Sequence, residues 1–114
     1  MEVTLKELAG PVTCAALAGR LDAIGADRIG LRFTAGVAAQ GRNAVIDMSG
    51  VEFVASMGIR LLISAARALS QKGAKMVLFG AQPAVQEVFD DAALDQILPI
   101  VATEADALAA LAAD

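Results

Sequence analysis

Histidine, tryptophan and tyrosine are absent from all 114 residues of the chain. Without histidine, the usual Ser-His-Asp and Cys-His catalytic sites cannot form, and metal sites lose their commonest ligand. The one cysteine, Cys14, cannot form an internal disulfide, which is typical of proteins from a reducing compartment. It lies in an apolar stretch, and we expect it to be buried. These absences argue against an enzyme and against a metal site.

Long hydrophobic runs and excess positive charge are also missing. No uncharged segment approaches the ~18 apolar residues of a membrane helix, and the first residues lack the basic and then apolar pattern of a signal peptide. The formal net charge of -4 does not favour nucleic acid as a partner. We therefore expect a cytoplasmic protein that does not insert into a membrane, folded as one domain over residues 1–114.

Motifs that hold cofactors or activate nucleophiles are absent too. The ten glycines are not spaced as a Walker A loop or as a dinucleotide fingerprint. Ser56 lies in Val-Ala-Ser-Met-Gly, which lacks the first glycine of a nucleophile elbow. The adjacent carboxylates of Asp90 and Asp91 do not face each other on a helix. We expect no metal, no nucleotide and no organic cofactor.

Apolar residues make up 57% of the chain and aromatic residues 4%, so the expected core consists of Ala, Val, Leu and Ile. Hydrophobic periodicity and turn residues divide the chain into short elements. We predict strands at 2–8, 12–18, 44–48, 76–79 and 97–101, and helices at 23–40, from Ser56 to Gly73, at 83–91 and at 104–112. Strands that alternate with helices form parallel pairs through crossover connections. The prediction is an α/β fold of about five strands and four helices, with a mixed, mostly parallel sheet and an antiparallel first strand at its edge.

Several local features refine this prediction. Gly19 is expected to end the second strand, and Asp22 to cap the next helix. The helix that follows Ser56 has the clearest amphipathic pattern, with an apolar stripe formed by Ile59, Leu62, Ile63, Ala66 and Leu69. The segment 49–56 is predicted to be a loop, and Pro99 places the last strand at a sheet edge.

Residues 47–59 carry the most specific pattern: Asp-Met-Ser-Gly-Val-Glu-Phe-Val-Ala-Ser-Met-Gly-Ile. This segment resembles the signature of STAS domains, the fold of anti-sigma factor antagonists. That signature has Asp-Leu-Ser-Gly-Val at the end of a strand, then Phe, then Asp-Ser-Ser-Gly-Leu at the start of a helix. Residues 19–22 are similar to the family's Gly-x-Leu-Asp, and residues 83–89 and 94–100 look like its late helix and last strand. The resemblance covers nearly the whole chain.

The resemblance implies an anti-sigma factor antagonist, a protein-binding switch and not an enzyme. In this family a kinase-type anti-sigma factor phosphorylates the first serine of Asp-Ser-Ser-Gly, and the unmodified antagonist binds that kinase. The matching residue is Ser56, whereas Ala55 and Met57 depart from the family pattern. The partner-binding residues implied are Asp22, Asp47, Ser49, Ala55, Ser56, Met57, Gly58 and Arg60. Arg60, one helix turn after Ser56, is a candidate to pair with a phosphate.

Each of these residues has a structural interpretation as well. Ser56 could cap the helix that it precedes, and Asp22 and Asp47 could serve in caps or turns. Ser49 and Gly50 could shape a loop, in which Gly50 would need a positive φ. Phe53 is expected to anchor the core. The sequence leaves both interpretations of each polar residue open.

The same resemblance allows a second function. STAS domains also serve as accessory subunits of lipid-transport ABC complexes and as scaffold parts of stress-signalling assemblies, without control by phosphorylation. The altered triplet of Ala55, Ser56 and Met57 supports this alternative. A weak homodimer is open in either case.

Overall fold

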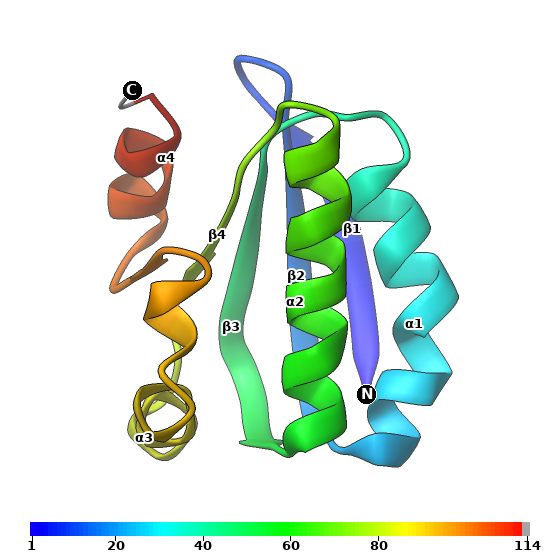
Figure 1. The fold of residues 1–114 in the computed structure, drawn as a ribbon, viewed down its shortest axis with the longest axis vertical. Coiled ribbons are helices and arrows are strands. Elements are labelled where there is room, and N and C mark those ends of the chain that lie inside the picture. The colour runs from blue at the N-terminus through cyan, green and yellow to red at the C-terminus, as the bar shows by residue number, and fades with distance from the viewer. Residues whose placement is uncertain (113–114) are drawn as a thin grey trace.

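The computed structural model describes residues 1–112, which form one five-stranded sheet and four α-helices (Figure 1). In chain order the elements are β1 (Glu2–Leu8), β2 (Val12–Leu21), α1 (Ala23–Ala38), β3 (Ala44–Val54), α2 (Ser56–Gln71), β4 (Met76–Phe79), α3 (Pro83–Asp91), the 3-10 turn η1 (Leu94–Gln96), β5 (Ile100–Val101) and α4 (Glu104–Ala112). The strand order is β1-β2-β3-β4-β5; β1 is antiparallel to β2, and the other pairs are parallel. The predicted fold class is confirmed.

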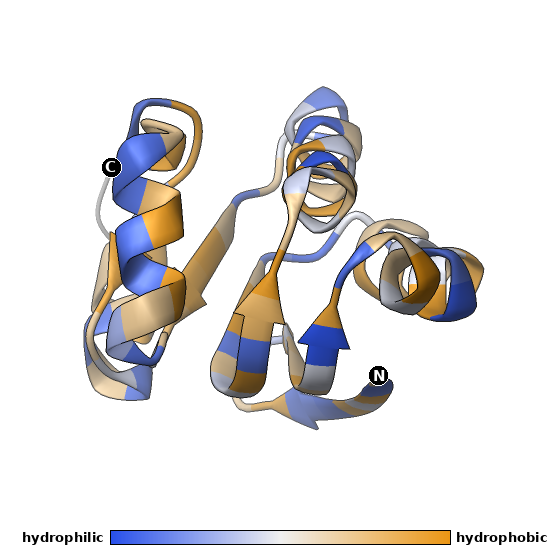
Figure 2. Cartoon of the chain, turned by 90° about the horizontal axis from the view of Figure 1, so that it is seen from below, coloured by the Kyte–Doolittle hydropathy of each residue, from blue (hydrophilic) through white to orange (hydrophobic). Residues whose placement is uncertain are grey.

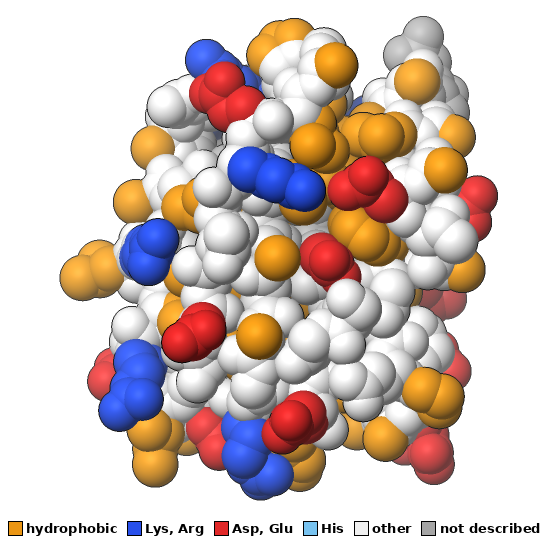
Figure 3. All heavy atoms as spheres, turned by 180° about the vertical axis from the view of Figure 1, so that it is seen from behind, with side chains coloured by type: hydrophobic (Ala, Val, Ile, Leu, Met, Phe, Trp, Pro, Cys, Tyr) orange, Lys and Arg blue, Asp and Glu red, His pale blue; other side chains and the backbone are white. Residues whose placement is uncertain are grey.

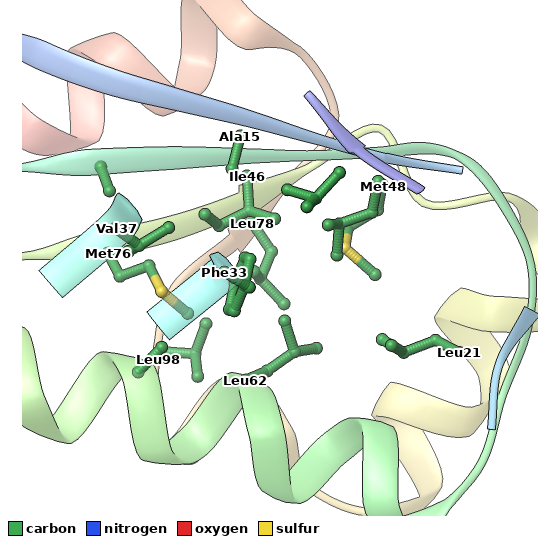
Figure 4. Close-up of a cluster of buried hydrophobic side chains, with 14 of the residues drawn as sticks. Ala15, Leu21, Phe33, Val37, Ile46, Met48, Leu62, Met76, Leu78 and Leu98 are labelled. Carbon is green, nitrogen blue, oxygen red and sulfur yellow. The ribbon is translucent and has the colours of Figure 1, made fainter. Parts of the chain in front are cut away.

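Helices cover both faces of the sheet. A view from the end where α1 and α2 begin shows these two helices on the same side of the first three strands (Figure 2). They and α3 pack on one face, where Phe33, Leu62 and Phe89 are fully buried. Figure 4 shows Phe33 and Leu62 among the strand side chains of that core. The opposite face has a smaller core, to which α4 contributes Ala107. Successive residues of a strand point to opposite faces, so every strand between two helix layers must be apolar on both sides.

Cys14 lies in the smaller core and is 2% exposed, as predicted. Burial raises the pKa of its thiol, because removal from water disfavours the thiolate. The opposing effect of Lys6 is smaller. Cys14 is therefore a packing residue.

The second strand does not end at Gly19, contrary to the prediction. β2 continues to Leu21. Gly19 has φ of 110°, a conformation that glycine adopts readily, and the register with β3 shifts between Gly19 and Arg20. The extra residue at this shift lies on β3, because Gly19 pairs with Val51 and Arg20 with Phe53, and the pairing resumes beyond it.

The predicted loop at 49–56 is also wrong, because β3 runs on to Val54. Gly50, Val51, Phe53 and Val54 all pair with residues of β2. Pairing with a neighbouring strand holds this polar, glycine-containing segment extended, which local composition does not indicate. Gly50 does not have the expected positive φ. Its role is close approach, since a Cβ there would lie 2.8 Å from the carbonyl oxygen of Leu17.

The last strand is shorter than predicted but lies at the predicted edge. β5 pairs with β4 through Ile100 and Val101 alone, while residues 94–96 form the 3-10 turn. Pro99 lacks an N–H and contributes its carbonyl, which accepts a bond from Leu78 N at 3.0 Å. The capping of α4 is confirmed: Thr103 Oγ1 accepts a bond from Asp106 N at 3.1 Å.

Candidate functional site

The candidate site lies where the carboxyl ends of β2 and β3 meet the amino ends of α1 and α2. Figure 1 shows both helices beginning at the lower end of the molecule. The N–H of Ala55 donates to the carbonyl of Leu21 at 3.0 Å, which joins the two strand-to-helix junctions. This bond brings Asp22, which follows Leu21, to the same end as the start of α2. Most of the predicted partner-binding residues therefore gather here: Asp22, Ala55, Ser56, Met57, Gly58 and Arg60.

Ser56 is the first residue of α2, and the prediction that it caps the helix is wrong. The N-cap is Ala55, whose backbone is extended and whose methyl side chain makes no cap bond. The helix starts one residue earlier than the serine pattern indicates, because Ala55 O already accepts bonds from Gly58 N and Ile59 N. Ser56 is exposed. Capping therefore does not account for its presence.

Two neighbours of Ser56 extend the exposed surface. Met57 is 47% exposed, a large fraction for an apolar side chain. Arg60 is exposed, and no salt bridge between residues 1–112 includes it. Both residues line a groove of ≈ 380 Å³ between α1 and α2. The start of α2 thus offers a hydroxyl, an apolar side chain and a free guanidinium within about one helix turn.

Gly58 has a packing role that the sequence did not indicate. The residue is buried, and a Cβ at this position would lie 2.4 Å from the carbonyl oxygen of Leu21 and 2.6 Å from its Cγ. Only a glycine lets the first turn of α2 approach the end of β2 so closely. Gly58 therefore positions the first turn of α2, and a partner contact at this buried residue stays a prediction.

We expect Gly58→Ala to destabilise the fold by about 1–3 kcal/mol, because the methyl group must displace backbone of β2. Gly30→Ala is the matched control, since nothing lies within 4 Å of a Cβ there. That change should stabilise the protein by about 0.5–1 kcal/mol through helix propensity. Urea denaturation of both variants measures the difference. Equal effects of the two substitutions would contradict the close approach of α2 to β2.

Asp22 caps α1, as predicted. Its Oδ1 accepts a bond from Gly25 N at 2.8 Å, and its Oδ2 lies 3.5 Å from Arg20 Nε. The bond from the Gly25 amide, and to a lesser extent the charge of Arg20, lower the pKa of the carboxyl below its ordinary value of 3.8. The side chain remains 31% exposed, so capping does not hide it from a partner.

The lowered pKa of Asp22 predicts a dependence of stability on pH. The unfolded chain binds the proton more readily, so this group stabilises the fold above its ordinary pKa of 3.8. The contribution is lost as the pH falls through the lower folded-state pKa. The variant Asp22→Asn keeps a capping oxygen but has no titrating group at this position. The stability of wild type relative to this variant should therefore fall between about pH 5 and pH 2, as measured by urea denaturation at each pH; an unchanged difference would contradict the cap assignment.

Phe53 is not a core residue, contrary to the prediction. It is 40% exposed, and the guanidinium carbon of Arg20 lies 4.3 Å from the centre of its ring. Val51 and Val54 occupy the buried positions of this part of β3 instead, next to the register shift opposite Arg20. Arg20 thus stacks on Phe53 while it pairs with Asp22, and it links two exposed groups of the site.

Asp47 and Ser49 lie away from this end of the molecule. Asp47 Oδ1 accepts bonds from Ser49 N at 2.9 Å and from Ser49 Oγ at 2.7 Å, and Ser49 O accepts one from Gln82 Nε2 at 2.9 Å. Val54 lies five residues after Ser49 in β3, about 16 Å of extended chain. Both residues lie within β3, so the expected turn does not form there, and the local hydrogen bonds occupy Asp47 Oδ1. A partner contact at these two residues stays a prediction.

Residues 1–112 contain no group of three His, Cys, Asp or Glu side chains that could hold a metal ion. In the same range, no helix is long and apolar enough to cross a bilayer. Seen from the side of the sheet opposite α1 and α2, hydrophobic side chains are interspersed with charges of both signs (Figure 3).

Sequence reasoning missed two exposed apolar residues of α1. Ile24 is 75% exposed and Leu31 is 91% exposed. They lie two helix turns apart and off the buried stripe of Ile29, Phe33 and Val37. The sequence alone could have indicated these two residues, because they fall outside the periodic apolar positions of the helix.

Comparisons with known proteins give consistent results. A Bordetella bronchiseptica protein, provisionally named anti-sigma factor antagonist BtrV, is 27% identical over 110 residues, which cover 96% of this chain and 94% of that protein. The solved structure of an anti-sigma-factor antagonist (STAS) domain protein from Planctomyces limnophilus is 28% identical, with a TM-score of 0.86 and coverage of 97% and 98%. The phosphorylated form of the Bacillus cell fate determinant SpoIIAA, 21% identical, has the same fold with a TM-score of 0.69 and coverage of 95% and 97%. The sequence model of the STAS domain matches residues 4–107, and the chain belongs to the STAS domain family.

Proposed function

We propose that this chain is an anti-sigma factor antagonist that binds a serine-kinase anti-sigma factor through the exposed start of α2. The observation that carries the proposal is the exposure of Ser56 at the first position of that helix, free of a capping role. Asp22, Met57 and Arg60 lie at the same end of the molecule and provide an acidic, an apolar and a basic group. Binding, and not catalysis, is the activity that these groups can provide.

We propose that phosphorylation of Ser56 controls partner binding. A phosphate adds about -1.5 to -2 charges at pH 7. The positive end of the helix dipole stabilises an anion at the first turn, and Arg60 lies one turn further on the same helix. A partner that covers a neutral serine would have to bury the added charge, so it would dissociate. The similar protein SpoIIAA has been solved in both its unphosphorylated and its phosphorylated form, which supports such a switch in the family.

Phosphorylation with ATP and a kinase-type anti-sigma factor from the same organism tests this proposal. We expect one phosphate on the wild-type chain, located at Ser56 by mass spectrometry, and none on Ser56→Ala. Ser64, an exposed serine two turns along α2, serves as the internal control and should stay unmodified. Modification at Ser64, or equal labelling of Ser56→Ala, would overturn the assignment of the site.

Ala55 and Met57 favour a second candidate function. The family pattern has Asp and Ser at these positions, so both groups that flank the target serine are altered. A STAS domain that retains the binding face without phospho-control would act as an accessory subunit of a lipid-transport ABC complex or as a scaffold subunit. Co-purification separates the two: a kinase-type anti-sigma factor supports the first function and a transporter ATPase the second. In either case we propose a single cytoplasmic domain that needs no cofactor.

A further inference from the structure

Helices α1 and α2, taken together, have a net charge of opposite sign to that of the rest of the chain. These two helices together carry four arginines and one aspartate, a net charge of +3. Because the whole chain has a net charge of -4, the remainder carries -7. All four arginines are exposed, and no salt bridge among residues 1–112 includes any of them. They are Arg28, Arg32, Arg60 and Arg67.

Apolar side chains lie within this basic surface. Ile24, Leu31 and Met57, with exposed fractions of 75%, 91% and 47%, all belong to α1 or α2. Single exposed apolar residues are ordinary on a protein surface. Three of them on adjacent helices, with Arg60 in the same groove as Leu31 and Met57, have the composition of an interaction site with an apolar centre and a charged rim. Arg28 and Arg32 line a separate hollow with Glu2.

The groove between α1 and α2 gives this surface its shape. Leu31 forms part of one wall, and Met57 and Leu61 form part of the other. Arg60 and Ser64 line both this groove and an adjoining hollow of ≈ 540 Å³ that extends to Arg67. Arg60 and Arg67 are two helix turns apart, which is about 10 Å along α2. The groove thus runs beside a row of spaced cations.

We infer that the groove between α1 and α2 binds an amphipathic helix of a partner protein, with acidic residues along its polar flank. Leucine or isoleucine side chains of that helix would pack between Leu31 and Met57, and glutamates seven residues apart would reach Arg60 and Arg67. The apolar contacts supply affinity, while the charges set specificity and speed the encounter. The surface adjoins the Ser56 site but does not depend on phosphorylation there.

Asp27 favours a partner helix over a membrane as the occupant of the groove. This carboxylate lies in the groove wall with Leu31. A flat anionic bilayer would meet Asp27 directly and be repelled, whereas a helix can place a lysine or a small residue opposite it.

An NMR titration of the ¹⁵N-labelled chain tests this inference with a synthetic peptide. The probe is an 18-residue helical peptide with leucines on one face and glutamates seven residues apart on the flank. We expect saturable shifts of amide resonances in α1 and α2, which weaken as added salt screens the charges. A peptide with lysine at each glutamate position should produce no such shifts. No shifts at millimolar peptide, shifts confined to other elements, or equal binding of the lysine peptide would each overturn the inference.

Charge-reversed and polar variants locate the contacts. The double variant Arg60→Glu and Arg67→Glu should weaken peptide binding at least about 10-fold, and Leu31→Ser should weaken it as well. The controls are Lys6→Glu on β1 and Ile97→Ser after η1, which are exposed residues outside the groove and should leave binding unchanged. Vesicles of phosphatidylglycerol are the final arm: binding to them without binding to the peptide would assign the surface to a membrane and overturn the inference. Failure in any arm leaves the Ser56 proposal standing, since no Ser56 variant is used.

Discussion

Truncation of Leu62 to alanine is expected to cost about 2–5 kcal/mol of the free energy of unfolding. Leu62 is fully buried in the larger core, where α2 faces the sheet, and Figure 4 shows it among Phe33 and the strand side chains. The substitution removes apolar contacts and leaves a cavity that a sheet and three helices cannot readily close. Urea denaturation, compared at equal m-values, gives the loss.

Arg67→Ala is the matched control on the same helix. Arg67 is exposed and should contribute less than about 0.5 kcal/mol to stability. If Arg67→Ala proved as costly as Leu62→Ala, the faces of α2 would be assigned wrongly. The comparison is sharp because both residues share one helix and differ in burial.

Sequence analysis correctly predicted the elements that depend on residues close together in the chain. The stripe of α2 repeats over about three turns, and glycine follows as a stop at Gly73, which has φ of 78°. Asp22 could be predicted as a cap because capping depends on residues three positions apart. The second half of β3 could not, because its extended form depends on pairing with β2, distant in sequence. The same pairing, with its register shift, turned Phe53 outward.

Sequence analysis named the candidate residues but not their local geometry. Family resemblance located Ser56, yet the helix begins after Ala55, and a one-residue shift changes a capping serine into an exposed one. Gly58 belongs to the family pattern, but the physical reason for it, contact with Leu21, is tertiary. Asp47 and Ser49 fall in the same motif but lie earlier in β3, away from the end that leads into α2. Adjacency in sequence therefore did not indicate the separation of these two residues from Ser56 along β3.

Substitution of Ser56 should separate binding from stability. Because Ser56 makes no cap bond, Ser56→Ala should change stability by less than about 0.5 kcal/mol. Ser56→Asp should be at least as stable, since an acid at the first turn favours the helix dipole. The alanine variant should bind the kinase-type anti-sigma factor as wild type does. The aspartate variant should bind at least about 30-fold more weakly, because the partner must bury an unmatched charge. Thermal melting and calorimetric titration measure the two effects.

Ser70→Asp controls for charge alone, since it adds the same carboxylate at an exposed residue of α2 that lies outside the groove lined by Met57 and Arg60. It should weaken anti-sigma factor binding far less than Ser56→Asp does. Equal binding by Ser56→Asp and Ser56→Ala would show that the phospho-switch hypothesis is wrong for this chain.

The variant Ala55→Asp tests whether the missing acid at position 55 limits phosphorylation of Ser56. It restores the acid of the family pattern, and it supplies a capping oxygen where α2 now has none, which should stabilise the fold by about 1 kcal/mol. If kinase recognition requires that carboxylate, Ala55→Asp should speed phosphorylation of Ser56 beyond any effect of the added stability. Ala55→Asn is the matched variant: it caps the helix without the charge. A gain with aspartate but not with asparagine assigns the effect to charge; an equal gain assigns it to the capped helix.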